Sequence, residues 1–209
     1  MSDRVLAYGG GVSSTAAAVL YENRIREMVF CDHGGDYPET YEYVKYMEKQ
    51  GFPITVLKPN VQGFDNLPDY YEAKRCMPNR AWRDCTDKFK LRPQTKYYKQ
   101  SGVTDIFIGF EAGEEKRVKS EFRFRAGIMA SYPLIHDGVT REGCVEAIQK
   151  AGLKVPRRSC CWLCFNCNAA ECRQMAVEHP NLWERRKRMK VESLRNSAER
   201  RYNVLPNFI

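Results

Sequence analysis

Residues 5–20 of the chain read VLAYGGGVSSTAAAVL. A short apolar run is followed by three glycines, then by Ser13, Ser14 and Thr15, whose hydroxyls can cap a helix, and then by alanines that favour a helix. Glycine backbone lets a phosphate approach closely, and the free N–H groups at a helix start bind anions. The stretch therefore predicts a strand, a phosphate-binding loop and a helix, although a tight turn with a capping serine would give the same pattern.

The alternation of strand and helix signals continues through the first 150 residues. Further apolar runs that predict strands lie at residues 28–31, 54–57, 106–108 and 129–135. Helices are expected at residues 38–50, 88–101 and 140–151. Repeated strand, loop and helix units are typical of parallel sheets with helices on both faces. We therefore expect an α/β fold with a doubly wound, parallel, five-stranded sheet, followed by a cysteine-rich helical extension.

Composition and charge restrict the class of protein. The 209 residues are 43% hydrophobic and 29% charged, which is typical of a globular chain. The longest apolar runs, such as residues 16–20, are too short to span a bilayer, and the start of the sequence has no leader-like block, so we expect a cytoplasmic protein without membrane contact. The net charge of +8 favours binding of polyanions such as nucleotides or nucleic acids.

Nine cysteines are many for a chain without an export signal, and five of them lie between Cys160 and Cys172. The spacing C-x2-C-x2-C lets successive thiolates face one metal centre, which favours an iron–sulfur cluster or zinc over buried free thiols. Three close cysteines with a remote fourth would indicate [4Fe–4S], whereas two pairs would indicate Zn²⁺. The candidate ligands in this segment are Cys160, Cys161, Cys164, Cys167 and Cys172.

Five short motifs occur in a fixed order along the chain. They are GGGVSS at 9–14, CDHG at 31–34 with PET at 38–40, CTDKFK at 85–90 with Pro93, Gly109 with Glu114 and Arg117, and YPL at 132–134. In these motifs the chain resembles the PP-loop ATP pyrophosphatases, also called adenine nucleotide alpha hydrolases, and among them the phosphoadenosine phosphosulfate (PAPS) reductase-like branch. The chain departs from the family where Gly9, Val12 and Ser13 replace a serine, a lysine and an aspartate, and where Glu111 stands in the place of an arginine.

The resemblance implies a set of site residues. Nucleotide-binding residues would be Gly9, Gly10, Gly11, Val12, Ser13, Ser14, Thr15, Asp32, Gly109 and Glu114. Catalytic residues would be Ser14, Asp32, Lys88 and Arg117. Asp32 would hold Mg²⁺ or a polar edge of the nucleotide, unless it only turns the chain after its strand. The charge of the missing loop lysine would come from Lys88, Lys90, Arg92 or Arg117, and Cys85 would be the remote metal ligand.

The resemblance also implies a function and a division of the chain. Residues 1–155 would form the nucleotide-binding domain, and residues 156–209 a cysteine-rich, basic helical region packed on it. The expected activity is adenylation of an acceptor by ATP for sulfur transfer, with tRNA or DNA as acceptor and a cysteine desulfurase or another protein as sulfur donor. Two alternatives remain: a reductase of PAPS or adenosine phosphosulfate (APS), and a nucleotide- and metal-binding subunit without turnover.

Overall fold

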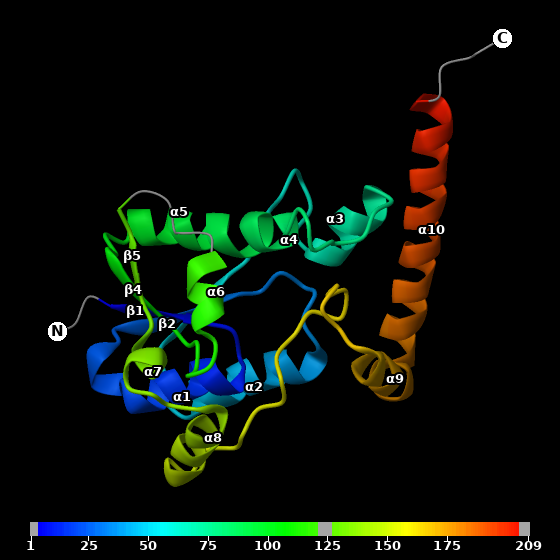
Figure 1. Cartoon of the computed structure of the whole chain (residues 1–209). Helices are drawn as coiled ribbons and strands as arrows, with labels where there is room; N and C mark the ends of the chain where they lie inside the picture. The colour runs from blue at the N-terminus through cyan, green and yellow to red at the C-terminus, as the bar shows by residue number, and fades with distance from the viewer. Residues whose placement is uncertain (1–3, 121–126, 205–209) are drawn as a thin grey trace.

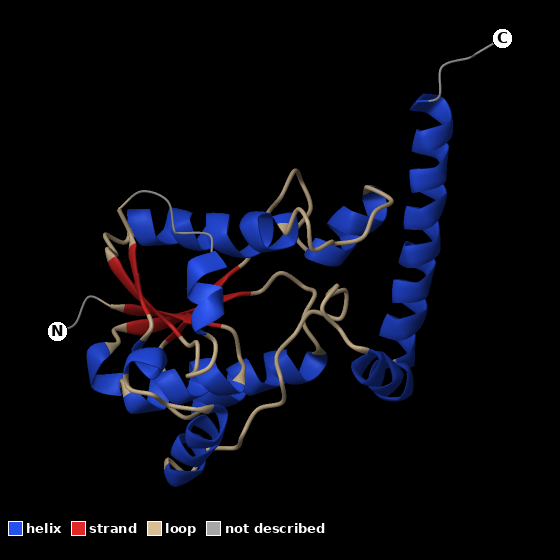
Figure 2. Cartoon of the chain, in the orientation of Figure 1, coloured by secondary structure: helices blue, strands red, loops and turns tan. Residues whose placement is uncertain are grey.

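A parallel sheet of five strands lies at the centre of the protein, for which a computed structural model describes residues 4–120 and 127–204. The strands are β1 (Val5–Tyr8), β2 (Glu27–Cys31), β3 (Ile54–Leu57), β4 (Asp105–Ile108) and β5 (Met129–Ser131). Their order is β3-β2-β1-β4-β5, every neighbouring pair is parallel, and helices lie on both sides of the sheet (Figure 2). This confirms the predicted doubly wound α/β fold. The order reverses between β1 and β4, and folds of this kind bind ligands at that point, beyond the carboxyl ends of the strands.

The helices cover the sheet as two layers and continue into a C-terminal region. They are α1 (Val12–Leu20), α2 (Pro38–Lys49), α3 (Leu67–Ala73), α4 (Asp84–Thr86), α5 (Arg92–Gln100), α6 (Glu115–Ser120), α7 (Pro133–His136), α8 (Arg141–Lys150), α9 (Ala169–Glu178) and α10 (Pro180–Val204). A 3₁₀ turn at Glu22–Arg24 and a π-helical turn at Asp87–Leu91 complete the set in the described residues.

Each face of the sheet carries its own apolar core. Leu6 and Phe107 pack with α1, α2 and α8 on one face, whereas Val5 and Ile106 pack with Tyr98 of α5 on the other. Because both faces of the inner strands β1, β2 and β4 are largely buried, their sequences read as apolar runs and not as alternating ones. This is why the strands could be found from the sequence.

Three segments differ from the sequence expectations. The helix expected at residues 88–101 begins earlier, at Asp84, and passes through the π-helical turn before α5. This wide turn directly precedes Pro93, whose ring lacks an N–H and crowds the preceding turn of a regular helix. The polar segment after Gly109 contains the short helix α6, and the segment expected to be extended at residues 129–135 bends into α7 at Pro133.

The C-terminal region packs against the α3 side of the sheet domain. Trp162, Leu163, Met175 and Met189 share a buried cluster with residues of α3 and with Phe89. The long helix α10 runs along one edge of the molecule (Figure 1), and Arg185 at its start forms ion pairs with α3. None of the helices in the described residues is both long and apolar enough to cross a membrane.

Candidate functional site

The glycine loop joins β1 to α1 at the point where the strand order reverses. Gly11 precedes the helix, and Thr15 N–H donates to its carbonyl oxygen at 2.9 Å, so the N–H groups of the residues between them come before the first intrahelical bond. The α1 first turn contains no acidic residue. Gly10 has φ +67°, in the left-handed region that favours glycine. This helix start is therefore suited to bind an anion.

Gly109, at the end of β4, lies directly against the start of α1. A Cβ atom on Gly109 would lie 2.7 Å from Ser14 Cα and 2.9 Å from Ser13 carbonyl oxygen, closer than real side chains approach backbone. Only glycine at this position lets β4 and α1 come so close together.

A cavity of about 560 Å³ opens between the glycine loop and the segment after β4. Its wall contains most of the residues that the family resemblance implies: Gly9, Gly11, Val12, Ser13, Ser14, Gly109, Glu114 and Arg117. The structure therefore brings together residues from two of the five motifs. Ser14 Oγ donates to the Gly11 carbonyl oxygen at 3.1 Å, so its hydroxyl helps to shape the loop itself.

Four arginines from separate segments line the same cavity: Arg83, Arg117, Arg141 and Arg158. Arg117 forms an ion pair with Glu114 and lies over the ring of Phe110, 3.9 Å from its centroid. Guanidinium groups bind phosphate oxygens through paired hydrogen bonds. The cavity therefore combines a helix start and several arginines, which suits a ligand that carries phosphates.

Other predicted site residues lie outside the cavity wall. Thr15 is fully buried, and its hydroxyl lies 3.2 Å from the hydroxyl of Tyr8. Asp32 Oδ1 accepts a hydrogen bond from Gly34 N–H at 3.1 Å, as in an ordinary turn. Lys88 donates to the Tyr70 hydroxyl at 2.7 Å and forms an ion pair with Asp84.

Sequence reasoning missed several residues of the cavity wall, among them Arg141, Arg158 and Ser159. Arg141 is the first residue of α8, and Arg158 and Ser159 directly precede the cysteines. A Cβ atom on Gly11 would lie 2.5 Å from Ser159 Oγ, so Ser159 packs on the glycine loop itself. A weak signal existed for Arg158 and Ser159, because they adjoin the cysteine motif, whereas Arg141 lies in a helix with no other motif.

The cysteine segment, residues 158–168, is attached to the loop after β2. Trp162 N–H donates to the Gly35 carbonyl oxygen at 2.9 Å, and Asp36 forms an isolated antiparallel bridge with Cys161. From the other side, the Arg186 guanidinium of α10 donates to the carbonyl oxygens of Trp162 at 2.7 Å and Cys164 at 3.2 Å. Backbone contacts on both sides thus fix the segment beside the sheet domain.

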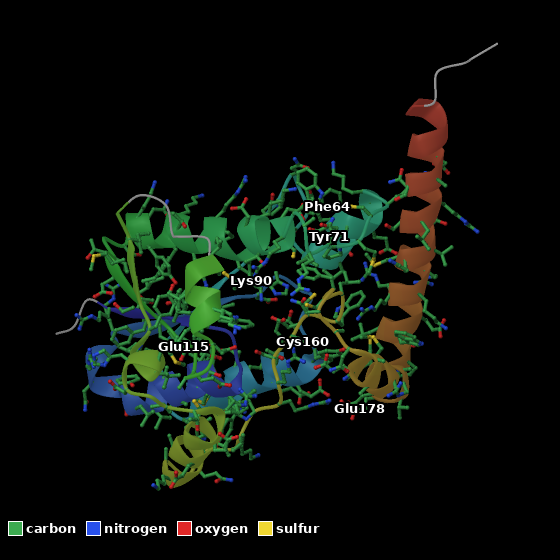
Figure 3. The ribbon with its side chains drawn as sticks, in the orientation of Figure 1. Phe64, Tyr71, Lys90, Glu115, Cys160 and Glu178 are labelled. Atoms are coloured by element: carbon green, nitrogen blue, oxygen red, sulfur yellow. The ribbon has the colours of Figure 1, made fainter. Side chains whose placement is uncertain are left out.

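The loop after β2, which holds the cysteine segment, contains a buried pair of ionisable side chains. His33 Nε2 and Asp36 Oδ2 are 3.3 Å apart, and both side chains are almost fully buried. Burial alone would raise the pKa of Asp36, but His33 and Lys90 outweigh it and hold this pKa at about 2. Burial opposes the charge of Lys90, yet Asp36 and nearby thiols raise its pKa overall. Lys90 and Cys160 both lie near the middle of the molecule in Figure 3.

The thiols of the segment divide into two groups. Cys160 and Cys167 hydrogen-bond to each other; this bond, followed by Arg186, lowers the pKa of Cys167, while it raises the pKa of Cys160. Burial is the main cause that raises the pKa of the Tyr37 hydroxyl, and electrostatic interactions with Cys160, Cys167 and Cys172 add to it. These three thiols therefore lie near the Tyr37 ring. Cys164 is an electrostatic neighbour of both Cys160 and Cys161.

Cys161 and Cys85 have different surroundings. A Cβ atom on Gly35 would lie 2.9 Å from Cys161 Sγ, so this thiol packs against the loop after β2. Burial raises the pKa of Cys161, and the nearby Asp36 carboxylate adds to the effect. Cys85 packs against the apolar cluster of α3, and burial raises the pKa of its thiol. The roles of both as metal ligands stay predictions.

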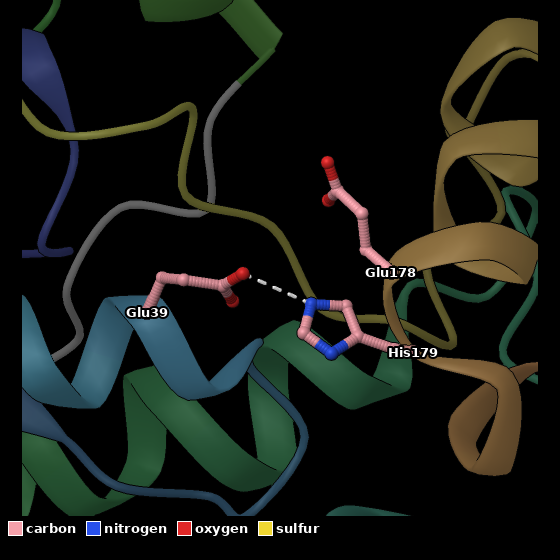
Figure 4. A group of neighbouring side chains, drawn as sticks. All are labelled: Glu39, Glu178 and His179. Carbon is pink, nitrogen blue, oxygen red and sulfur yellow. Dashed lines mark hydrogen bonds and ion pairs between the residues drawn. The ribbon is translucent and has the colours of Figure 1, made fainter.

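A second polar cluster joins α2 to the start of α10 (Figure 4). His179 Nε2 lies 3.0 Å from Glu39 Oε1, and the carboxylate of Glu178 completes a group of ligand atoms within 4.8 Å of one another. Arg157 forms ion pairs with both glutamates at 2.8 Å. Because a guanidinium already neutralises the carboxylates, we interpret the cluster as a tether between the two parts of the chain.

Comparison with known proteins assigns the fold. The model of the phosphoadenosine phosphosulfate reductase domain matches residues 3–150. The chain belongs to this family. Membership confirms the predicted resemblance to the PAPS reductase-like proteins. The cysteine segment lies beyond the matched residues.

Two solved structures share the fold at low sequence identity. The PAPS reductase of Candida auris, in a phosphate complex, is 15% identical, with a TM-score of 0.56, over 75% of this chain and 76% of that one. The U34-tRNA thiolase NcsA of Methanococcus maripaludis, with its [4Fe-4S] cluster, is 13% identical, with a TM-score of 0.52, over 89% of this chain and 70% of that one. None of the curated proteins matches the sequence closely enough to count as a relative.

Proposed function

We propose that the protein binds ATP in the glycine-loop cavity and adenylates an acceptor for sulfur transfer. One observation carries this proposal: the cysteine segment supplies Arg158, Ser159 and Asn166 to the wall of the same cavity that the glycine loop lines. The wall of this cavity thus contains both the glycine loop and direct chain neighbours of the thiols, because Ser159 precedes Cys160 and Asn166 lies between Cys164 and Cys167. Such proximity is what a reaction that activates with a nucleotide and then transfers sulfur requires.

The proposed reaction has two steps. An acceptor oxygen attacks the α-phosphorus of ATP, the bond from that phosphorus to the β-phosphate oxygen breaks, and pyrophosphate leaves. A sulfur nucleophile then attacks the carbon that carries the adenylated oxygen, the C–O bond breaks, and AMP leaves. The helix start at Ser13 and Ser14, with Arg117, would stabilise the negative charge of the phosphates. Mg²⁺ would enter with the nucleotide, because phosphates supply many of its ligands.

We propose that thiols of the C-terminal region hold a metal centre. In the described residues no three of their sulfur atoms lie within 4.8 Å of one another, so the thiols would move together when a metal binds. Cys160, Cys164, Cys167 and Cys172 are the ligands we favour, because Cys160, Cys167 and Cys172 share the surroundings of Tyr37 and Cys164 neighbours Cys160. The lowered pKa of Cys167 provides a thiolate, which is the form that binds metal. Soft thiolate donors select Zn²⁺ or an iron–sulfur cluster. When bound, a [4Fe–4S] cluster would carry or activate the sulfur.

A nucleic acid is the acceptor we favour. A groove of about 640 Å³ beside β3 and α5 is lined by Lys58, Lys88, Arg92 and Lys96. Basic grooves bind nucleic-acid backbones through phosphate contacts that weaken with salt. In this groove Lys88 pairs with Asp84 and Arg92 with Asp87. The first arginines of α10 are also engaged within the protein, because Arg185 pairs with α3 and Arg186 binds the cysteine segment. Support for a tRNA or DNA partner therefore comes mainly from Lys58 and Lys96 of the groove.

A reductase of PAPS or APS is the second candidate. The observation that favours it is the Cys160–Cys167 pair, in which one thiol stabilises the other as a thiolate close to residues of the cavity wall. In that reaction a thiolate attacks the sulfur of the sulfate group, the S–O bond to the phosphate breaks, and the nucleotide 5′-phosphate leaves. A second thiol then attacks the sulfur of the modified cysteine, a disulfide forms and sulfite leaves. The nucleotide is therefore the substrate and not the source of energy. Both candidate reactions imply the same division of the chain. We propose that residues 1–155 form the nucleotide-binding unit and that residues 156–209 form the region packed on it.

Two product measurements separate these candidates. Anaerobically purified protein is incubated with ATP, Mg²⁺ and sulfide, with unmodified tRNA, with duplex DNA or with neither, and released pyrophosphate is measured. The same preparation is incubated with PAPS and a thiol reductant, and released sulfite is measured. Nucleic-acid-dependent pyrophosphate release supports ATP-driven sulfur transfer, and sulfite release supports the reductase. ATP binding without either product would contradict both and leave the non-catalytic subunit.

A further inference from the structure

The glycine loop of this chain lacks two charged residues that its family relatives carry. Val12 stands in the place of a lysine, Ser13 in that of an aspartate, and Glu111 in that of an arginine. A cavity for phosphates would thereby lose two cations, while the number of carboxylates stays the same, because Glu111 adds one and Ser13 removes one. The structure shows what lies at these positions instead.

Arg141 reaches the altered loop from a helix far away in the sequence. Its Nη1 donates to Ser13 Oγ at 3.2 Å and to Glu111 Oε2 at 3.3 Å, and Ser13 Oγ donates to the same carboxylate oxygen at 2.5 Å. Arg141 and Glu111 both line the glycine-loop cavity. The three side chains thus form one hydrogen-bonded group at the start of α1.

The packing of α8 fixes the position of Arg141. Thr140 caps the helix by accepting a hydrogen bond from Gly143 N–H at 3.3 Å, which makes Arg141 the first helical residue. Cys144 and Ile148 of the same helix are fully buried in the core cluster that contains the alanines of α1. Because α8 packs on α1, its first residue lies beside the start of α1, where the loop ends.

The position of Arg141 in the first turn of α8 is electrostatically unfavourable for that helix. A cation in the first turn of a helix opposes the helix dipole, and acidic residues are favoured there. The Glu111 carboxylate compensates for this locally, and it leaves the Arg141 side chain 43% exposed toward the cavity. Features that cost stability locally are typical of functional positions.

We propose that Arg141 is the phosphate-binding cation of the glycine loop, and that Glu111 and Ser13 position it. This inference rests on the proposed nucleotide binding. Arg117 and Arg158 also line the cavity, but they pair with Glu114 and Glu171, whereas Arg141 is hydrogen-bonded to Ser13 and Glu111 themselves. The arginine that the family carries in the segment after β4 is thus supplied here from the first turn of α8.

Binding of ATP and of adenosine to Arg141→Ala tests the proposal. We expect the dissociation constant for ATP to rise about 10- to 100-fold, because hydrogen bonds between charged groups are lost, while that for adenosine changes less than about twofold. Lys150→Ala is the matched control, since Lys150 is an exposed cation at the other end of α8. Unchanged ATP binding, or equal losses for ATP and adenosine, would overturn the assignment. Wild-type protein that binds neither ligand would instead refute the proposed nucleotide binding.

A charge exchange gives a second, independent measurement. Arg141→Glu alone places a second carboxylate beside Glu111, and we expect ATP affinity to fall by more than about 100-fold. The double variant Glu111→Arg with Arg141→Glu restores one cation and one carboxylate in the same pair. We expect it to recover at least about tenfold of the lost affinity. A double variant that binds ATP no better than Arg141→Glu would overturn the pairing, and melting temperatures of all variants show whether each is folded.

Discussion

The glycine loop and the cysteine segment line the same cavity but are held in place in different ways. The loop is fixed by main-chain contacts, because Gly109 touches the backbone of Ser13 and Ser14 and leaves no room for a side chain. The cysteine segment is fixed by groups from distant elements, namely Gly35 on one side and Arg186 on the other. The comparison teaches that the loop is built into the fold of the sheet domain, whereas the segment depends on its neighbours.

The largest effect is expected where the loop touches β4. Gly109→Ala would place a Cβ atom 2.7 Å from Ser14 Cα, and backbone cannot move aside as a flexible side chain can. We expect the free energy of unfolding to fall by about 2 kcal/mol, as for overpacked cores, with a parallel loss of ATP binding. Denaturant unfolding and nucleotide titration measure the two effects.

Gly9→Ala is the matched control for this substitution. The nearest atom to its added Cβ would be Ser159 Oγ at 4.0 Å, so the side chain fits without a clash. We expect a change in the free energy of unfolding of less than about 0.5 kcal/mol. Equal losses in the two variants would show that the loop is not fixed by its contact with β4.

The sheet and the loop could be predicted from the sequence because their signals are local. The apolar runs of the strands and the glycines of residues 9–11 each report on their own surroundings, and the structure confirms the order that they imply. Arg141 could not be found in this way, because its place in the site results from the packing of α8 on α1. That contact is tertiary and leaves no motif near Arg141 itself.

The cysteine spacing predicted the chemistry of the thiols but not the side of the chain to which each thiol points. Cys160 and Cys161 are neighbours in an extended stretch, and successive side chains of such a stretch point to opposite sides. Cys160 accordingly pairs with Cys167, whereas Cys161 packs against Gly35. The C-x2-C-x2-C pattern includes Cys161 and omits Cys160. Spacing alone therefore could not show that Cys160 is the thiol that pairs with Cys167.

The stability of the contact between the sheet domain and the cysteine segment is expected to depend on pH. The pKa of Asp36 is held at about 2, below its ordinary value of 3.8, so its charged form stabilises the folded protein above about pH 4. This stabilisation is lost as the pH falls from about 4 to about 2, because the carboxylate becomes protonated. The shift corresponds to about 2 kcal/mol.

Asp36→Asn tests this pH dependence. We expect the variant to be less stable than the wild type at pH 6 and the difference in unfolding free energy to shrink as the pH approaches 2. Denaturant unfolding at several pH values between 2 and 6 gives this difference directly. A difference that stays constant over the range would show that the charge of Asp36 contributes nothing at the attachment.

The smallest and most local effect is expected at Arg186. Removing its guanidinium in Arg186→Ala breaks the hydrogen bonds to the carbonyl oxygens of Trp162 and Cys164, at a cost of about 1 kcal/mol. Because the sheet domain has its own cores, we expect faster amide exchange within residues 158–168 and a lower metal content, with exchange in β1 and β4 unchanged. Lys190→Ala removes an exposed cation of the same helix and controls for charge. If exchange rose equally in the segment and the sheet, the segment would be part of one cooperative unit with the loop, and the contrast between the two regions would fail.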